Sequence, residues 1–168
     1  YIFDFGTVYG MVALWGGVWG VVIARQWRQQ RNTSLALLMF AVGLLLQEFG
    51  QVSYAVYYYL WAIEIPYPSV GDIGFFGSVL FYIAGVFFLA KASGINLKLK
   101  TFKNKLLATI VPLSMLLLGY LLFLQDYQLD LSDPIRVFLD FGYPLFATVY
   151  VSVALLIYLL TRDTTGSI

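Results

Sequence analysis

Five long apolar stretches constrain this chain more than any other feature of its sequence. A helix needs about 20 apolar residues to cross the roughly 30 Å hydrocarbon core of a bilayer, and each stretch is near or above that length. The stretches run over residues 6–24, 34–60, 75–92, 106–124 and 137–160. Because only short polar segments separate them, the sequence predicts an all-α polytopic transmembrane helical bundle with five spans.

The composition agrees with this fold class and excludes several others. Of the 168 residues, 61% are hydrophobic and 11% are charged, and the mean hydropathy is +0.82. The chain has no His and no Cys, which excludes disulfides, Cys/His zinc sites, iron–sulfur clusters and catalytic triads that need an imidazole. A net charge of +1 leaves no basic footprint for nucleic acid. We therefore expect a non-enzymatic protein with no metal, no cofactor and no nucleic-acid partner, surrounded by membrane lipids.

The charged residues predict the orientation of the spans. Of the 10 Lys and Arg residues, all except Arg136 lie after the first span, around the link between the third and fourth spans, or after the fifth span. The positive-inside rule places these segments in the cytoplasm. The sequence thus predicts a multi-pass protein of the inner or plasma membrane, with its N-terminus outside and its C-terminus cytoplasmic.

A short motif recurs along the chain and suggests a duplication. Asp-x-Gly occurs at residues 4–6, 72–74 and 140–142, which gives a repeat of 68 residues, and each copy lies near the start of an outside-to-inside span. Equal spacing of helical hairpins is typical of parallel two-helix repeats. Helix capping by the aspartates is the alternative explanation. We expect residues 1–168 to form a single transmembrane domain within a longer chain of about seven spans.

Polar side chains in the outer half of the second span are candidate functional residues, because polar groups inside a bilayer are costly. One stripe on this helix consists of Gln47, Gln51, Tyr54 and Tyr58, at steps of four, three and four residues. Glu48 lies beside this stripe, about 21 Å from Ser34 along the helix axis. An ionised carboxylate at that depth needs a partner or a water-filled cavity.

Three residues of other spans are expected at the same outer depth, namely Asp72, Asp140 and Tyr143. Together with Glu48 and the stripe, they predict an outward-facing polar pocket with aromatic walls for a small-molecule ligand. An alternative stays open, in which Glu48 and the glutamines only join helices through hydrogen bonds. Capping is likewise an alternative explanation for Asp140.

The segment PYPSVGDIGFF, residues 66–76, resembles the pattern P-x-P-S-x-x-D-x-x-[FY] of polytopic membrane proteins of unknown function from uncultivated bacteria. Similar segments occur in the N-terminal membrane regions of diguanylate cyclases and other signalling proteins. The sequence Asp140-x-x-Tyr143-Pro144-Leu145 resembles a second element of those regions. The resemblance implies a sensory-type membrane module, about seven helices in size, and it assigns no catalytic residue.

Two functions follow as predictions. The first is an integral membrane sensor or small-molecule-binding module, acting as a homo-oligomer or with a signalling partner. The second is a small-solute or ion transporter or channel subunit, which parallel repeats and a Glu–Gln stripe would suit. Residues 35–46 of the second span are almost wholly apolar, which favours a pocket open on one side over a pathway.

Overall fold

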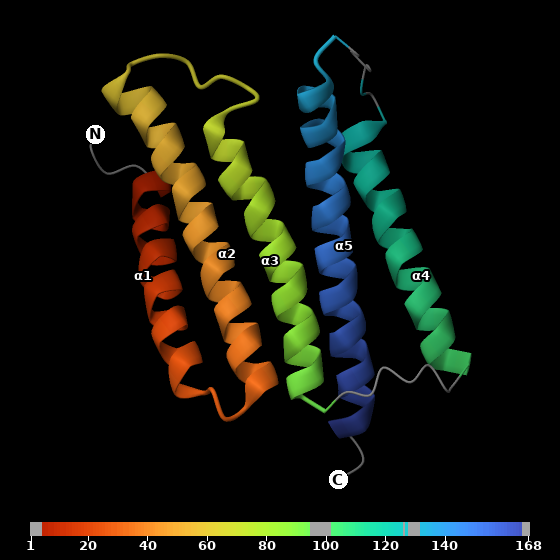
Figure 1. Cartoon of the computed structure of the whole chain (residues 1–168). Coiled ribbons are helices and arrows are strands. Elements are labelled where there is room, and N and C mark those ends of the chain that lie inside the picture. The colour runs from red at the N-terminus through yellow and green to blue at the C-terminus, as the bar shows by residue number, and fades with distance from the viewer. Residues whose placement is uncertain (1–4, 95–101, 126, 128–131, 166–168) are drawn as a thin grey trace. The chain divides into compact units, whose positions relative to one another are not determined.

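The computed structural model describes residues 5–94, 102–125, 127 and 132–165, and every element in it is helical, which confirms the all-α prediction (Figure 1). The elements are α1 (Phe5–Gln26), α2 (Arg31–Ala55), η1 (Val56–Leu60), α3 (Val70–Ala92), α4 (Phe102–Gly119), η2 (Tyr120–Leu124) and α5 (Pro134–Thr165). The short segments η1 and η2 are π-helical and continue α2 and α4 directly.

Four helical segments of the described residues are long and apolar enough to cross a membrane. They are Arg31–Leu60, Val70–Ala92, Lys105–Leu122 and Pro134–Leu159. These segments correspond to the second to fifth predicted spans, and they make the chain a multi-pass membrane protein by helix length and hydropathy. The first predicted span falls in α1, a helix of 22 residues with no charge between Phe5 and Ala24. Membrane crossing by α1 stays a prediction.

The chain divides into two compact units, residues 1–85 and 86–168, and each is described by itself. The first unit holds α1, α2, η1 and most of α3, and the second holds α4, η2 and α5. The single transmembrane domain and the 68-residue repeat stay predictions. Asp4, in the first copy of the Asp-x-Gly motif, lies outside the described residues.

Glycines bring the three helices of the first unit close together, with α2 between α1 and α3 (Figure 1). A Cβ added to Gly20 of α1 would lie 2.8 Å from the Cβ of Ala41 in α2. A Cβ added to Gly74 of α3 would lie 2.5 Å from the carbonyl oxygen of Leu46 and 2.8 Å from the backbone nitrogen of Gly50. Small residues at such crossings let helix backbones approach, which is how helices associate where lipid removes the hydrophobic driving force.

The residues buried in the first unit are accordingly small, and the large apolar side chains point outward. Four buried alanines lie in α1 and α2, namely Ala13, Ala24, Ala36 and Ala41. Trp15 of α1, in contrast, is 68% exposed. A soluble protein would bury such a side chain, whereas hydrocarbon surrounds it at no cost in a membrane. This distribution therefore fits the membrane assignment.

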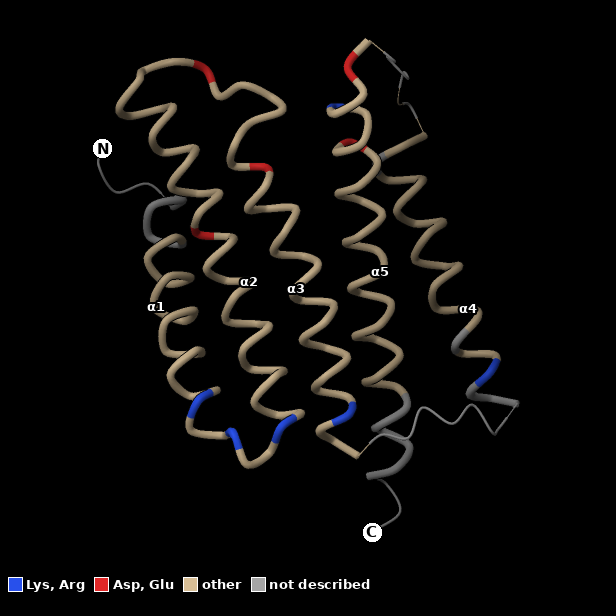
Figure 2. Tube along the Cα trace, in the orientation of Figure 1, with Lys and Arg blue, Asp and Glu red and all other residues tan. Residues whose placement is uncertain are grey.

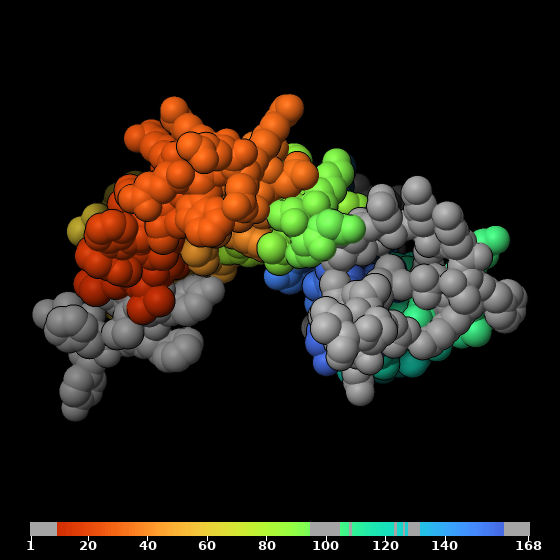
Figure 3. All heavy atoms as spheres, turned by 90° about the horizontal axis from the view of Figure 1, so that it is seen from below, coloured from red at the N-terminus to blue at the C-terminus, as the bar shows by residue number. Residues whose placement is uncertain are grey.

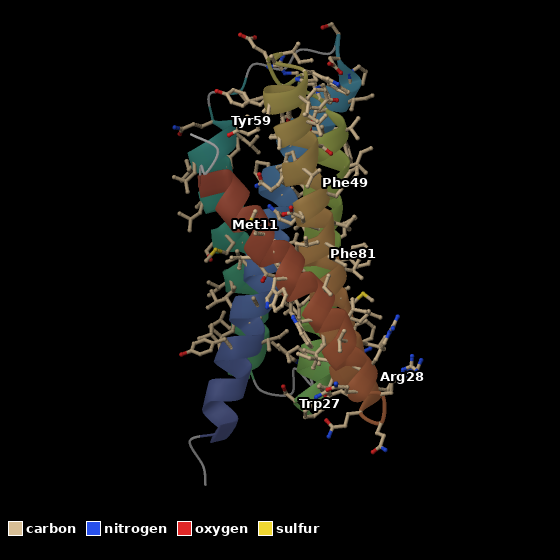
Figure 4. All side chains as sticks on the ribbon, turned by 90° about the vertical axis from the view of Figure 1, so that its left-hand side faces the viewer. Met11, Trp27, Arg28, Phe49, Tyr59 and Phe81 are labelled. Atoms are coloured by element: carbon tan, nitrogen blue, oxygen red, sulfur yellow. The ribbon has the colours of Figure 1, made fainter. Side chains whose placement is uncertain are left out.

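Basic and acidic residues of the first unit lie in different parts of its helices, the basic ones at one end (Figure 2). Arg25, Arg28 and Arg31 are all exposed at the turn from α1 to α2. Side chains of this turn project from the end of the unit that Figure 3 shows, and Figure 4 labels Trp27 and Arg28 there. The acidic residues lie away from this turn, with Glu48 in the C-terminal half of α2 and Asp72 in the first turn of α3.

In the second unit α4 and α5 form an antiparallel hairpin (Figure 1). Asp133 caps α5, because its Oδ1 accepts a hydrogen bond from the backbone N–H of Arg136 at 3.1 Å and Pro134 takes the first helical position. Asp140 lies in the second turn of α5 rather than at its start. Capping therefore does not explain Asp140.

Candidate functional site

A pocket of about 350 Å³ opens in the first unit between α1, the last turns of α2, η1 and the loop that follows. Its volume lies at the lower end of the usual range for small-molecule sites, roughly 300–1,000 Å³. The lining residues are Gly10, Met11, Glu48, Gln51, Val52, Tyr54, Ala55, Tyr58, Tyr59 and Ile65. Figure 4 shows two of them, Met11 on α1 and Tyr59 on η1.

The carboxyl group of Glu48 is seated against the backbone of α1 at Gly10. A Cβ added to Gly10 would lie 2.6 Å from Oε2 and 3.1 Å from Oε1 of Glu48, so the glycine leaves room for the carboxyl group in this position. Oε2 is buried and has no hydrogen-bond partner among the described residues. An unpaired buried oxygen is costly, and Oε2 is an acceptor that no described residue uses.

The predicted polar stripe of α2 divides into two sets. Two of its members bond to α3. The Ser78 hydroxyl, fully buried, donates to Oε1 of Gln47 at 3.0 Å. The Tyr54 hydroxyl donates to Oδ1 of Asp72 at 3.4 Å. These two contacts are the helix-joining hydrogen bonds that the alternative interpretation of the stripe predicts, and Gln47 is not among the pocket-lining residues.

The other set faces the pocket without partners. Gln51 and Tyr58 both line the pocket, and neither side chain makes a hydrogen bond to any residue that the structure describes. Together with Glu48, they present a carboxyl, an amide and a phenol on neighbouring turns of α2 and η1. Glu48 lies about 100° around the helix from Gln47, whereas Gln51 lies only about 40° from it, on the same stripe.

Asp72 does not line the pocket, but it contacts a residue that does. It is 4% exposed, and its Oδ2 accepts hydrogen bonds from the backbone N–H and the hydroxyl of Ser69, at 2.7 and 2.9 Å. Asp72 thus satisfies the N-cap residue Ser69 at the start of α3, as the acidic residue of a capping box does. Through the bond from Tyr54, Asp72 also positions a tyrosine that lines the pocket.

Close packing holds the ring of Tyr54 in place as well. It meets the ring of Phe75 edge to face, with centroids 5.0 Å apart. A Cβ added to Gly71 would lie 2.7 Å from the Tyr54 ring, so this glycine makes room for it. The PYPSVGDIGFF segment therefore places one wall of the pocket.

The two remaining predicted residues, Asp140 and Tyr143, belong to α5 in the second unit. Oδ2 of Asp140 accepts a hydrogen bond from the Tyr127 hydroxyl at 2.8 Å and lies 3.8 Å from Nε of Arg136. The ring of Tyr127 packs edge to face on Phe141, with centroids 5.0 Å apart. The participation of Asp140 and Tyr143 in a ligand site stays a prediction.

Sequence reasoning missed the α1 side of the pocket and the loop residue that completes it. Met11 and Ile65 are apolar residues in apolar surroundings, and no local pattern distinguishes them. Gly10 belongs to a glycine-rich helix, which signals close packing. Which side chain would pack against it depends on the crossing of α1 and α2.

The described residues contain no group of three or more His, Cys, Asp or Glu side chains that could hold a metal ion. Comparison of the chain with protein-family models, with curated proteins and with solved structures finds no match. The geometry of the pocket is therefore the basis for a functional proposal.

Proposed function

We propose that this membrane protein is a sensor or small-molecule-binding module whose ligand occupies the pocket at Glu48. One observation carries the proposal: Glu48, Gln51 and Tyr58 line a pocket with apolar and aromatic walls, and their polar groups lack partners among the described residues. The hydrogen bonds that join α2 to α3 come from Gln47, which does not line the pocket, and from the hydroxyl of Tyr54. A helix-joining role therefore does not account for Glu48 or Gln51.

A ligand in this pocket would act on the packing of α1 against α2. It would touch Met11 on α1 and Tyr58 on η1 at once, next to the glycine contact at Gly10. A ligand shifts a conformational equilibrium only by binding one arrangement better than another. The resemblance of the PYPSVGDIGFF segment to membrane sensory regions supports such a role, with a signalling partner or a second copy of the chain receiving the change.

We further propose that the pocket faces the outside of the cell and that the α1–α2 turn is cytoplasmic. The exposed Arg25, Arg28 and Arg31 in that turn support this orientation by the positive-inside rule. Because the chain has no Cys, single cysteines at Gln29 and Ile63 can be labelled in intact cells with an impermeant thiol reagent. Labelling of Ile63→Cys and not of Gln29→Cys is expected, and the reverse pattern would invert the topology.

Transport is the alternative function, and one observation speaks against it. Between Leu35 and Leu46, α2 carries no polar side chain, so the polar surface of this helix does not continue inward from Gln47. Uptake of an ion or solute into vesicles that hold the protein, with loss of that uptake in Glu48→Gln, would favour transport over a one-sided pocket.

Native mass spectrometry of the detergent-purified protein tests the binding proposal. We expect a small adduct in one-to-one stoichiometry on the parent chain, retained in Glu64→Gln and lost in Glu48→Gln. Glu64 is an exposed carboxylate of the neighbouring loop outside the pocket lining, so its substitution is a matched control for the loss of one charge. Heterogeneous lipid adducts alone, identical in all three proteins, would contradict the proposal.

A further inference from the structure

The charge of the pocket points to a chemical class of ligand, in an inference that rests on the proposed function. We propose that the pocket binds an organic ammonium ion, with the cationic nitrogen at the Glu48 carboxylate and the carbon skeleton against the apolar and tyrosine walls.

The pocket lining contains one formally charged side chain, Glu48, and no basic one. The basic residues of the α1–α2 turn lie toward the other end of the first unit (Figure 2). Arg31 is about 26 Å from Glu48 along the axis of α2, at 1.5 Å per residue. A carboxylate removed from water is stable only with a partner. No described residue of this unit forms an ion pair with Glu48, and a cationic ligand would supply the missing positive charge.

The other groups of the lining suit an ammonium ion as well. Gln51 offers an amide oxygen and Tyr58 a phenol oxygen, and both can accept N–H hydrogen bonds. The rings of Tyr58 and Tyr59 lie 4.9 Å apart at 90°, edge to face. An aromatic face attracts a cation within about 6 Å of its centroid. A cation with an apolar body would therefore meet favourable groups on several sides.

An inorganic cation fits this lining less well. Divalent hard cations take six or more oxygen ligands, whereas the pocket has a single carboxylate, and the described residues hold no metal-binding group. The 350 Å³ volume and the walls of Met11, Val52 and Ile65 leave room for carbon atoms. The same ammonium chemistry occurs in free amines and in the headgroup of phosphatidylethanolamine, so the experiment separates these two sources.

Charge-selective modification of a pocket cysteine tests the inference. Since the chain has no Cys, Ala55→Cys places a single thiol in the lining and Ile63→Cys places one in the exposed loop outside it. Each variant is treated with methanethiosulfonate reagents that carry a trimethylammonium group, a hydroxyl group or a sulfonate group. The ratio of the cationic to the neutral rate is the measurement, because it cancels any change in the thiol's own reactivity.

With Glu48 present, the cationic reagent is expected to react fastest at Ala55→Cys. Adding Glu48→Gln should lower the cationic-to-neutral ratio there on the order of tenfold, and leave the ratio at Ile63→Cys within about twofold. Glu64→Gln removes a charge next to residue 63, so it should lower the cationic-to-neutral ratio at Ile63→Cys and leave the ratio at Ala55→Cys unchanged. If Glu48→Gln does not change the cationic-to-neutral ratio at Ala55→Cys, the ammonium inference is overturned, while the proposed binding pocket is not. Failure of the neutral reagent to reach Ala55→Cys would overturn the proposed function itself.

Protection experiments then identify the source of the ammonium group. Slower modification of Ala55→Cys by the neutral reagent with benzylammonium chloride, but not with benzyl alcohol, would indicate a free amine. Slower modification in bilayers of phosphatidylethanolamine than in bilayers of phosphatidylglycerol, with no amine added, would indicate the lipid headgroup. Equal protection by benzylammonium and benzyl alcohol, or protection by neither the amine nor the lipid, would overturn the inference.

Discussion

The helical hairpins α2–η1–α3 and α4–η2–α5 are built alike but keep their aspartates in different electrostatic surroundings. In each, the first helix ends in a π-helical segment, and a tyrosine hydroxyl bonds to an aspartate of the second helix. The pairs are Tyr54 with Asp72, at 3.4 Å, and Tyr127 with Asp140, at 2.8 Å. Each tyrosine ring also packs edge to face on a phenylalanine of the second helix, with centroids 5.0 Å apart.

The difference lies in what balances each carboxylate. Asp72 is 4% exposed and is balanced by the backbone N–H and the hydroxyl of Ser69. The side chain of Asp140 is 20% exposed and faces Arg136, which is itself 60% exposed. Removal of a buried carboxylate leaves its donors unpaired, whereas water easily replaces a partner in a solvated ion pair. Two similar motifs are thus expected to differ in how strongly each hairpin depends on them.

The largest expected effect comes from the glycines where each hairpin closes. Gly74→Ala should destabilise the protein by about 3 kcal/mol, because the new methyl group meets the backbone of α2, which cannot rotate away. Gly119→Ala should change stability by at most about 1 kcal/mol, since the methyl group meets only Oγ1 of Thr148, a side chain that can turn. Unfolding in mixed detergent micelles measures both variants, and equal losses would remove the distinction between the hairpins.

The aspartates should show the next largest difference. Asp72→Ala is expected to cost about 2 kcal/mol, because the N–H of Ser69 and the hydroxyl of Tyr54 lose their acceptor in a buried place. Asp140→Ala should cost about 1 kcal/mol or less, since water can reach Arg136. The same unfolding assay measures both, with the Tyr54→Phe and Tyr127→Phe variants isolating the hydroxyl contacts. A costlier Asp140→Ala would reverse the comparison.

The smallest effects distinguish the two sets of polar residues within the first hairpin. Gln47→Leu should cost about 1 kcal/mol, because it removes the hydrogen bond between α2 and Ser78 of α3. Gln51→Leu should leave stability within about 0.5 kcal/mol, as no described partner is lost, and should weaken the pocket adduct in native mass spectra. If Gln51→Leu destabilised as much as Gln47→Leu, Gln51 would have a structural role after all.

Much of the helical architecture could be predicted because it depends on local composition. The second to fifth spans follow from the length of apolar runs, and their predicted ranges agree with the helices to within a few residues. The π-helical ends at Val56–Leu60 and Tyr120–Leu124 could not be predicted, since no local signal distinguishes them from continued α-helix. The capping sequence of α5 is Asp133-Pro134 and not Asp140, which the alternative explanation of the Asp-x-Gly motif had assigned to capping.

The candidate site was only partly accessible from the sequence. Glu48, Gln51, Tyr54 and Tyr58 were found because polar residues are conspicuous in an apolar helix, and all four line the pocket. Their separate roles were not found, because a stripe on one helix does not tell which neighbour each side chain faces. Gln47 and Gln51 look alike in sequence, yet one bonds to Ser78 and the other has no described partner.

The sequence by itself determined that the chain is helical and crosses a membrane, because hydrocarbon leaves no alternative for long apolar segments. It also determined that carboxyl and amide groups lie inside a span. Only the tertiary structure decided which of these groups are satisfied. The crossing at Gly10 brings α1 against Glu48, and the crossing at Gly74 brings α3 against the opposite side of α2. Helix crossings are set by contacts between distant residues, and no local pattern along one helix contains them.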